Sequence, residues 1–370
     1  MSTLSRQLKE SWAVVEDRAD QIAGYLYARL FMRQPGLREM FPLHMDLQRE
    51  RLVGAVARAI QIIDSPEQFD SYLRRLGRDH RKYGVRPHHF DVFGECLIEA
   101  VRAHSGVTWD VTYEQAWREG FQAIAERMIA GAADDAHNPA YWDAEVLTHE
   151  RRAHDIAVFT VRTELPLPYR AGQYVTIESP YQPRTWRRYA VANAPRHDGV
   201  MEFHVRAIGH CVVSSSLVWK LTVGDMIRIG PADGTMTLDL GTPRDLVCVA
   251  SGIGLAPIKA ILEELAKTNR TRWAHLFFGV RNRDELYDTP ALQELAGRCP
   301  WLSLVPVVSD DPGAPYEHGS VSDVVASYGP WQNHDFYLCG SQTMVNATLQ
   351  VLRQMQVPPT RINHDAIEIS

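Results

Sequence analysis

The sequence predicts a multidomain chain: an all-α first third, then an antiparallel β-barrel, then an α/β unit built on a parallel sheet. Only four of the 21 prolines precede residue 139, and because proline is excluded from helix interiors, the first third can be nearly all helix. Short β-rich runs separated by Gly/Pro turns follow, and the end of the chain alternates strands with helices. These changes of pattern predict domains at 1–138, 139–242 and 243–370.

Composition excludes several classes of protein. A net charge of −6 provides no basic field for nucleic acid or anionic lipid. The most apolar stretch, residues 246–262, is interrupted by Gly, Pro and Lys259, so it does not fit a membrane span. Five cysteines without a C-x-x-C pair argue against a disulfide framework or structural zinc, and the N-terminus lacks a secretory apolar region. We therefore expect a cytoplasmic protein that binds small molecules, with no nucleic-acid, membrane or protein partner indicated.

In the first third, apolar residues recur at helical spacing: Leu26, Leu30 and Phe31, then Leu52, Val56, Ala59, Ile60 and Ile63. Pro66 and Pro87 are placed to begin helices. A last helix is expected over about 113–129, and residues 131–140 are expected to form a linker.

One histidine of this helical part lies on an apolar face. His80 follows its neighbours at steps of three or four: Tyr72, Leu73, Leu76 and then Tyr83 on the other side. From the residues alone, a core histidine is the simpler interpretation. Tyr27, Gln48 and Phe41 likewise have ordinary explanations as a core residue, a solvated residue and a hydrophobic plug.

The middle third carries five β-rich runs, at residues 155–163, 173–179, 187–194, 201–208 and 225–232. Arg187 and Tyr189 are two apart on one run and share a face, so a cation for phosphate and a ring for stacking can serve one ligand. A small-residue turn with Ser214 and Ser215 is a second possible phosphate cradle. An exposed arginine beside a core tyrosine is the alternative.

The last third contains a glycine-rich turn between a buried strand and a helix. Gly252, Gly254 and Pro257 form G-x-G-x-x-P, in which glycines let the backbone approach a pyrophosphate at a helix N-terminus. Cys339 and Gly340 end a later strand, at the edge where open α/β sheets bind ligands. An ordinary tight turn, with Cys339 as a small core residue, is the alternative.

The order of these motifs resembles the ferredoxin–NADP reductase superfamily: R-x-Y-x-x-x-N, a Gly/Ser turn, GxGxxP and YLCG. The resemblance implies that Arg187 binds the FAD pyrophosphate, that Tyr189 packs on the isoalloxazine and that Ser214 and Ser215 hold phosphate. Ala190 stands where this superfamily usually has Ser or Thr near the flavin. The residues implied to hold the nicotinamide nucleotide or cover the flavin are Gly252, Gly254, Pro257, Cys339, Gly340 and Asp365.

The helical third resembles the globin domain of flavohaemoglobins, in YLYARLFMRQPGLREMF (25–41), LQRERL (47–52) and GRDHRKYGVRPHHFDVFGECL (77–97). The order globin, FAD domain, NAD(P)H domain is also that of this family. The resemblance implies haem b, with His80 as the iron ligand and Tyr27 and Gln48 as distal hydrogen-bond donors. Phe41 would pack on the porphyrin, and Leu52 would shape the distal pocket.

This resemblance implies that electrons pass from NAD(P)H through FAD to haem, and that nitric oxide is oxidised with dioxygen to nitrate. Phe90 and Ala132 stand where the family usually has a Tyr and a Glu that support the proximal histidine, which predicts a weaker electron donor. Another electron acceptor, or an O2 or NO sensor with its own reductase, is the alternative function. Arg281 and Arg283 leave the choice between NADH and NADPH open.

Overall fold

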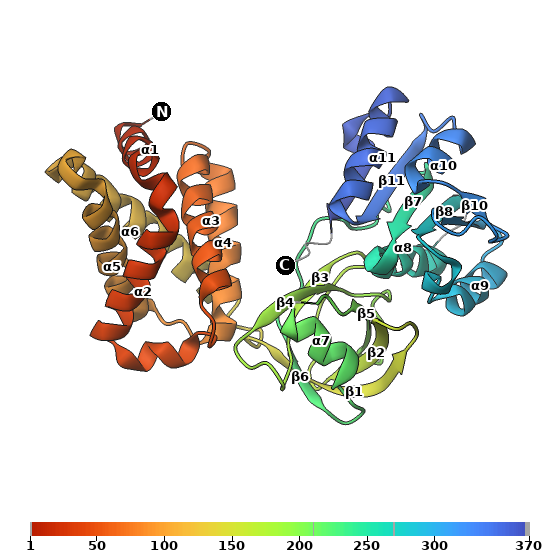
Figure 1. The fold of residues 1–370 in the computed structure, drawn as a ribbon, viewed down its shortest axis with the longest axis horizontal. Coiled ribbons are helices and arrows are strands. Elements are labelled where there is room, and N and C mark those ends of the chain that lie inside the picture. Colours follow the sequence, from red (N-terminus) through yellow and green to blue (C-terminus); the bar gives the residue numbers. More distant parts are fainter. Residues whose placement is uncertain (1, 210, 269–270, 367–370) are drawn as a thin grey trace. The chain divides into compact units, whose positions relative to one another are not determined.

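The computed structural model describes residues 2–209, 211–268 and 271–366, and the chain divides into two compact units, Met1–Tyr141 and Trp142–Ser370 (Figure 1). None of the described helices is long and apolar enough to cross a bilayer. The all-α, antiparallel β and parallel α/β succession predicted from the sequence is confirmed.

Six α-helices make up the described part of the first unit: α1 Thr3–Val15, α2 Ala19–Arg33, α3 Asp46–Ile62, α4 Pro66–His80, α5 Pro87–Ser105 and α6 Val111–Asp134. The two predicted prolines begin α4 and α5, where the missing N–H and fixed φ of proline cost nothing. Helix α6 is longer than predicted, because residues 131–134 of the expected linker are helical and pack against α4.

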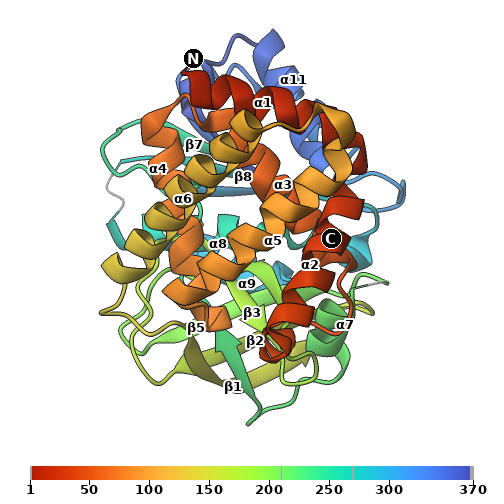
Figure 2. The same ribbon diagram turned by 90° about the vertical axis from the view of Figure 1, so that its left-hand side faces the viewer.

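Helices α4 and α6 pack so closely that their backbones are in contact (Figure 2). A Cβ added to Gly77 on α4 would overlap the Met128 carbonyl oxygen, and one added to Gly131 on α6 would overlap the Arg74 carbonyl oxygen. Glycine at both positions therefore lets the backbone that ends at His80 lie directly on α6.

The second unit begins with an antiparallel sheet in the order β4-β3-β6-β1-β2-β5. Its strands are β1 Trp142–Arg151, β2 Ile156–Thr163, β3 Tyr174–Glu178, β4 Trp186–Ala190, β5 Val200–Arg206 and β6 Met226–Ile229. A bridge between Val191, just after β4, and Phe203 on β5 joins the two edges of the sheet, as the predicted barrel requires. Strand β1 is absent from the predicted runs, although its alternate residues Trp142, Ala144 and Val146 are buried.

A parallel sheet follows, in the order β10-β9-β8-β7-β11-β12. Its strands are β7 Asp245–Ser251, β8 Ala274–Val280, β9 Leu302–Val308, β10 Glu317–His318, β11 His334–Gly340 and β12 Ile362–Ala366. The chain adds β8 to one side of β7 and later adds β11 to the other. The carboxyl end of β7 is therefore the topological switch point, where sheets of this kind bind ligands.

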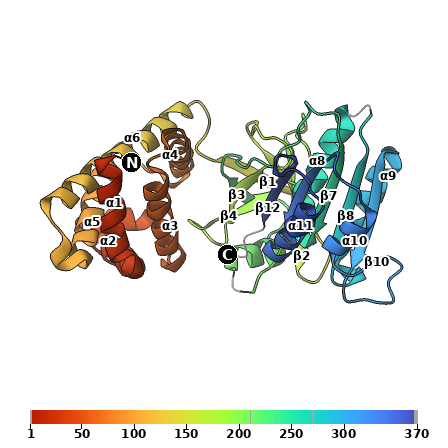
Figure 3. The same cartoon turned by 90° about the horizontal axis from the view of Figure 1, so that it is seen from above.

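Helices cover both faces of this sheet: α8 Leu255–Thr268, α9 Thr289–Arg298, α10 Val321–Tyr328 and α11 Gln342–Gln354. On β7, Leu246 and Cys248 pack with α8 and α9, whereas Val247 and Val249 pack with α10 and α11. Figure 3 shows α10 and α11 in front of the strands. Burial on both faces explains why this strand is continuously apolar.

Candidate functional site

His80 is the last residue of α4, and its ring is fixed by the preceding turn of that helix. Nδ1 donates a hydrogen bond to the carbonyl oxygen of Leu76 over 2.7 Å, which leaves Nε2 as the ring nitrogen with a free lone pair. Burial lowers the pKa of His80 and outweighs the opposing charge of Asp79. A neutral imidazole with one oriented nitrogen is the form that ligates haem iron.

The two positions expected to support this histidine carry no polar side chain. Phe90 belongs to an apolar cluster with Phe69, Leu73 and Leu76. Ala132 lies on α6 and carries no polar group. Among the described residues, the hydrogen-bond partner of the imidazole is thus a backbone carbonyl and not a carboxylate.

Tyr27 on α2 and Gln48 on α3 come together. The Gln48 side-chain amide donates to the Tyr27 hydroxyl over 3.2 Å. Tyr27 is buried, which raises its pKa to about 12, although the bond from Gln48 opposes the shift. The hydroxyl therefore keeps its proton, for which no described residue is an acceptor, so it can donate to a bound ligand.

Apolar side chains surround this pair. The Tyr27 ring lies 5.9 Å from the Phe31 ring and 5.3 Å from the Phe41 ring, measured between centroids. Phe41 and Leu52 pack against the core but remain partly exposed. A neutral imidazole, a buried hydroxyl proton and partly uncovered apolar side chains together fit a haem group.

Arg187 and Tyr189 lie two apart on β4, as predicted. The Arg187 Nη1 donates to the Trp186 carbonyl over 3.1 Å, but its Nε is buried without a hydrogen-bond partner among the described residues. Burial raises the pKa of Tyr189. A buried guanidinium N–H without a partner fits a residue that binds an anion such as the FAD pyrophosphate. Ala190, which follows Tyr189, is half-buried and offers no hydroxyl.

The Gly/Ser turn leads into α7 Val212–Trp219. The Ser214 hydroxyl accepts from the Ile208 N–H over 3.2 Å and donates to the Cys211 carbonyl over 3.1 Å, so it stabilises the turn from within. Ser215 is half-buried, and no hydrogen bond of its hydroxyl is described. Of the two serines, Ser215 is therefore the one whose hydroxyl is not already used within the turn.

The two glycine motifs of the parallel sheet meet at the switch point. A Cβ at Gly254 would overlap the carbonyl of Cys339, and one at Gly340 would overlap the Ser251 hydroxyl. Gly252 has a left-handed φ of 52°, and Pro257 lies in the first turn of α8. Gly254 and Gly340 therefore allow the two turns to pack closely, and the half-buried Gly252 is the position at the start of α8 whose backbone can approach a pyrophosphate.

Three further predicted positions lie at the same carboxyl edge. Asp365 on β12 is in register with Cys339 on β11. Arg283, after β8, is bound to Asp311 through both Nε (2.5 Å) and Nη2 (2.9 Å), whereas Arg281 is exposed. Arg281 is thus the arginine of this segment that is not committed to a carboxylate.

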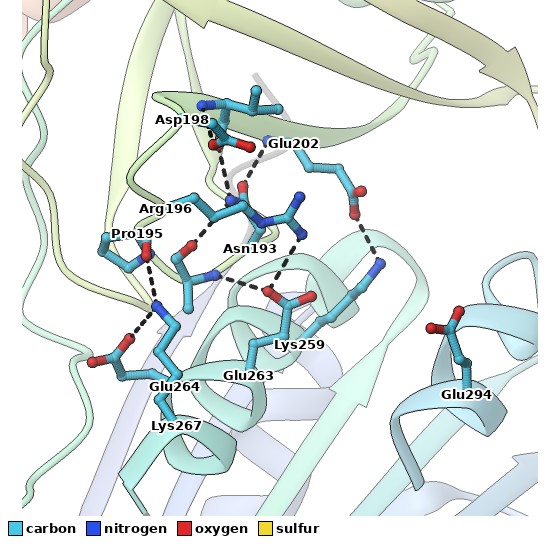
Figure 4. Close-up of polar contacts among 12 residues, drawn as sticks. Asn193, Pro195, Arg196, Asp198, Glu202, Lys259, Glu263, Glu264, Lys267 and Glu294 are labelled. Carbon is cyan, nitrogen blue, oxygen red and sulfur yellow. Dashed lines mark hydrogen bonds and ion pairs between the residues drawn. The ribbon is translucent and has the colours of Figure 1, made fainter. Parts of the chain in front are cut away.

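A polar network between the barrel and α8 was not predicted (Figure 4). Lys259 on α8 contacts Glu202 on β5, and His204 on the same strand contacts Glu202 as well. The sequence contains one indication of it, because Lys259 interrupts the most apolar stretch of the chain.

The three parts of the chain match three family models: "Globin" at residues 25–128, "Oxidoreductase FAD-binding domain" at 143–237 and "Oxidoreductase NAD-binding domain" at 248–350. A flavohemoprotein of Bacillus subtilis is 25% identical over 97% of this chain and 95% of its own length. The crystal structure of flavohemoglobin from Malassezia yamatoensis covers 99% of both chains, with a TM-score of 0.82 and 18% identity.

The reductase part also has relatives that are electron-transfer components. The reductase component of the naphthalene 1,2-dioxygenase/salicylate 5-hydroxylase systems of a Ralstonia species is 32% identical over 59% of this chain and 66% of its own length. The reductase subunit of an Amycolatopsis aromatic O-demethylase is 32% identical over 74% of this chain and 86% of its own length.

These findings define a globin fused to an FAD- and NAD-dependent oxidoreductase module. The chain carries these three domains in one order, and flavohemoprotein relatives match it over nearly its whole length; the globin domain implies haem, and the two reductase domains imply FAD and NAD(P)H. The family and the cofactors expected from the sequence are both confirmed.

Proposed function

We propose that this oxidoreductase takes electrons from NAD(P)H and oxidises nitric oxide with dioxygen to nitrate. The observation that carries the proposal is the pair of buried Tyr27 and half-buried Gln48, in a domain whose His80 presents a neutral, oriented imidazole. When bound, haem supplies the iron centre for the reaction of the two gases, and FAD converts a hydride into single electrons.

The proposed roles of the chain's own residues follow from their contacts. His80 holds the iron through Nε2, because its Nδ1 is occupied by the Leu76 carbonyl. Tyr27 donates its hydroxyl proton to a bound ligand that carries negative charge, and Gln48 orients that hydroxyl. Phe41 and Leu52 exclude water around them.

In the reductase unit, Arg187 and Ser215 bind the FAD pyrophosphate and Tyr189 packs on the flavin. Ser214 holds the turn, and Asp365 covers the flavin site. The nicotinamide nucleotide binds at the start of α8, over the half-buried Gly252. The shape of the turn there is set by buried residues, namely Gly254, Pro257, Cys339 and Gly340.

Nitric oxide consumption by aerated protein supplied with NADH or NADPH tests the proposal. We expect a rate that rises in proportion to haem content across preparations, with nitrate as the product. Nitric oxide turnover that is independent of haem content would overturn it.

A second function has its own support. Two reductase relatives at 32% identity are named as parts of other enzyme systems, a dioxygenase/hydroxylase system and an aromatic O-demethylase, and the proximal histidine lacks a carboxylate partner among the described residues. Under this alternative, the module reduces a different acceptor. Turnover with quinone or dye acceptors that far exceeds turnover with nitric oxide would favour it.

A further inference from the structure

A lysine ammonium is enclosed by two carboxylates inside the reductase unit. The Lys259 Nζ lies 2.8 Å from Glu202 Oε1 and 3.0 Å from Asp288 Oδ2, and its side chain is only 7% exposed. Asp288 is fully buried. Burial lowers the pKa of Lys259, but the two carboxylates outweigh burial and raise it, so the amine is charged.

The network continues on both sides of this lysine. The His204 Nε2 donates to Glu202 Oε1 over 3.0 Å. The other ring nitrogen, Nδ1, can therefore accept a hydrogen bond from the Tyr287 hydroxyl, which lies 2.8 Å from it. Arg152 pairs with Asp288. The two cations, Lys259 and Arg152, therefore face the two carboxylates of Glu202 and Asp288, and each of these four groups has an oppositely charged partner.

The network joins two functional segments of the reductase unit. Lys259 is five residues after Gly254, on the helix that the nucleotide-binding turn begins. Glu202 and His204 flank Phe203, which bridges to Val191, the residue after Ala190 of the flavin motif. The ion pair thus connects the helix behind the nucleotide turn to the strand beside the flavin motif (Figure 4).

A second contact lies on the same path. Arg206, at the end of β5, has its Nη1 3.5 Å from the position of a Cβ at Gly252, and its Nη2 pairs with Glu285 over 2.9 Å. The barrel strand therefore reaches the turn itself as well as the helix that follows it.

Apolar packing generally stabilises such an interface at least as well as a buried ion pair, because the free energy needed to desolvate the charges is about as large as their attraction. Unlike apolar packing, a buried ion pair fixes one relative position of the two elements that carry it, here α8 and β5. We propose that Lys259 is a positioning residue for hydride transfer, holding the nucleotide-binding turn at the right distance and angle from the flavin. This inference rests on electron flow from NAD(P)H to FAD and not on the nitric oxide reaction.

The test is Lys259→Met in the full-length protein loaded with haem and FAD. We expect the limiting rate of flavin reduction at saturating NADH or NADPH to fall by about 10- to 100-fold, because small displacements of reacting atoms carry costs of this size. The dissociation constant for NAD+ or NADP+, measured by calorimetry, should change by less than about threefold, since no group proposed to touch the nucleotide is removed.

Lys267→Met is the matched control. Lys267 also lies on α8 and also reaches the barrel, where its Nζ donates to the Pro195 carbonyl over 2.6 Å, but its side chain is 44% exposed (Figure 4). Flavin reduction in this variant should stay within about twofold of the unsubstituted rate, because exposed polar contacts contribute little.

Two further readouts separate positioning from a general loss of structure. In Lys259→Met, amide hydrogen exchange should accelerate in residues 200–206 and 252–260 while FAD content is retained. Lys259→Arg, which keeps the charge, should recover part of the rate. If Lys259→Met does not fold, Glu202→Gln carries the test, because it keeps the Lys259–Asp288 pair, and we expect a rate loss of about 3- to 10-fold.

Flavin reduction at the unsubstituted rate in a folded Lys259→Met protein would overturn the inference. So would a rate loss fully explained by lost FAD or weakened nucleotide binding. Failure of nitric oxide turnover with a normal dependence of flavin reduction on Lys259 would contradict only the proposed function.

Discussion

At the scale of single residues, His80 is defined by what its two ring nitrogens do. Nδ1 is bound to Leu76 and Nε2 is free, so replacement by alanine removes the one proposed iron ligand. We expect His80→Ala to lose the haem Soret band, or to shift it strongly, while the FAD absorbance remains. Absorbance spectra of the purified variants measure both.

His104→Ala is the control for this prediction. His104 on α5 makes the same kind of bond, from Nδ1 to the carbonyl four residues earlier, at the same 2.7 Å. It should leave the Soret band unchanged. A band that persists in His80→Ala and disappears in His104→Ala would refute the assignment.

Tyr27 tests the distal side. Tyr27→Phe keeps the ring contacts with Phe31 and Phe41 but removes the hydroxyl proton that has no acceptor among the described residues. We expect nitric oxide turnover to fall by about 100-fold, the scale for loss of one preorganised donor, with haem content unchanged. Tyr25→Phe, at a partly exposed site of the same helix, should change turnover little.

The sequence predicted the residue types at these sites better than their partners. The spacing of His80 placed it on an apolar helix face. Its hydrogen bond to the Leu76 carbonyl could be identified only from the folded helix. Ser214 and Ser215 look alike in the sequence, and folding alone decides that the first bonds inside its own turn. Lys259 acquires its role from Glu202 and Asp288, which lie far from it along the chain.

At the scale of elements, the crossing of α4 and α6 depends on two glycines. Gly131→Ala places a methyl group against the Arg74 carbonyl, so the helices must separate. We expect a loss of about 2–4 kcal/mol in the free energy of unfolding of the globin unit, from the strain of overpacking. Thermal or urea unfolding followed by circular dichroism provides the measurement.

Gly54→Ala is the matched control, because Gly54 lies on α3 and a Cβ there would meet nothing within 4 Å. Alanine should stabilise that helix by up to about 1 kcal/mol, the usual difference in helix propensity. Equal effects of the two substitutions would show that the close crossing carries no constraint.

The network between β5 and α8 predicts a pH dependence. Burial pushes the pKa of Glu202 up, but the bonds from His204 and Lys259 outweigh it and lower the pKa to about 2 from 4.5. A carboxylate of depressed pKa contributes stability that is present above pH 4.5 and is lost as the pH falls towards 2. That shift corresponds to about 3 kcal/mol, and Glu202→Gln should remove this part of the acid sensitivity.

Urea unfolding of the reductase unit at a series of pH values between 2 and 6 measures this dependence. Glu264→Gln is the control, since its carboxylate pairs with Lys267 near the surface of the same helix. It should keep the steep acid profile. An unchanged profile in Glu202→Gln would refute the contribution of the network.

Elements were predictable where one pattern dominated. Proline positions identified the starts of α4 and α5, and the continuous apolar run identified β7. The predicted end of α6 was wrong. The apolar periodicity stops near residue 129, but the packing of Gly131 against α4 continues the helix to Asp134. Strand β1 was missed because charged residues occupy its exposed alternate positions. The segment therefore looks polar in the sequence, although Trp142, Ala144 and Val146 are buried.

At the scale of the whole molecule, the order of three folds follows from where proline, β-rich runs and strand–helix alternation occur along the chain. The three family models, which match the chain in the same order, confirm this organisation. Contacts that tie segments together within a unit, such as Lys259 with Glu202, could not be predicted, because they depend on chain topology and not on local pattern.

In the electron-transfer route of this protein, electrons from NAD(P)H reach the haem through FAD. Absorbance spectra recorded anaerobically, before and after addition of NADH or NADPH, test it most directly. We predict that the flavin bands bleach first and that the Soret band then moves to its ferrous position. Flavin that bleaches while the haem stays ferric would exclude electron transfer from FAD to haem.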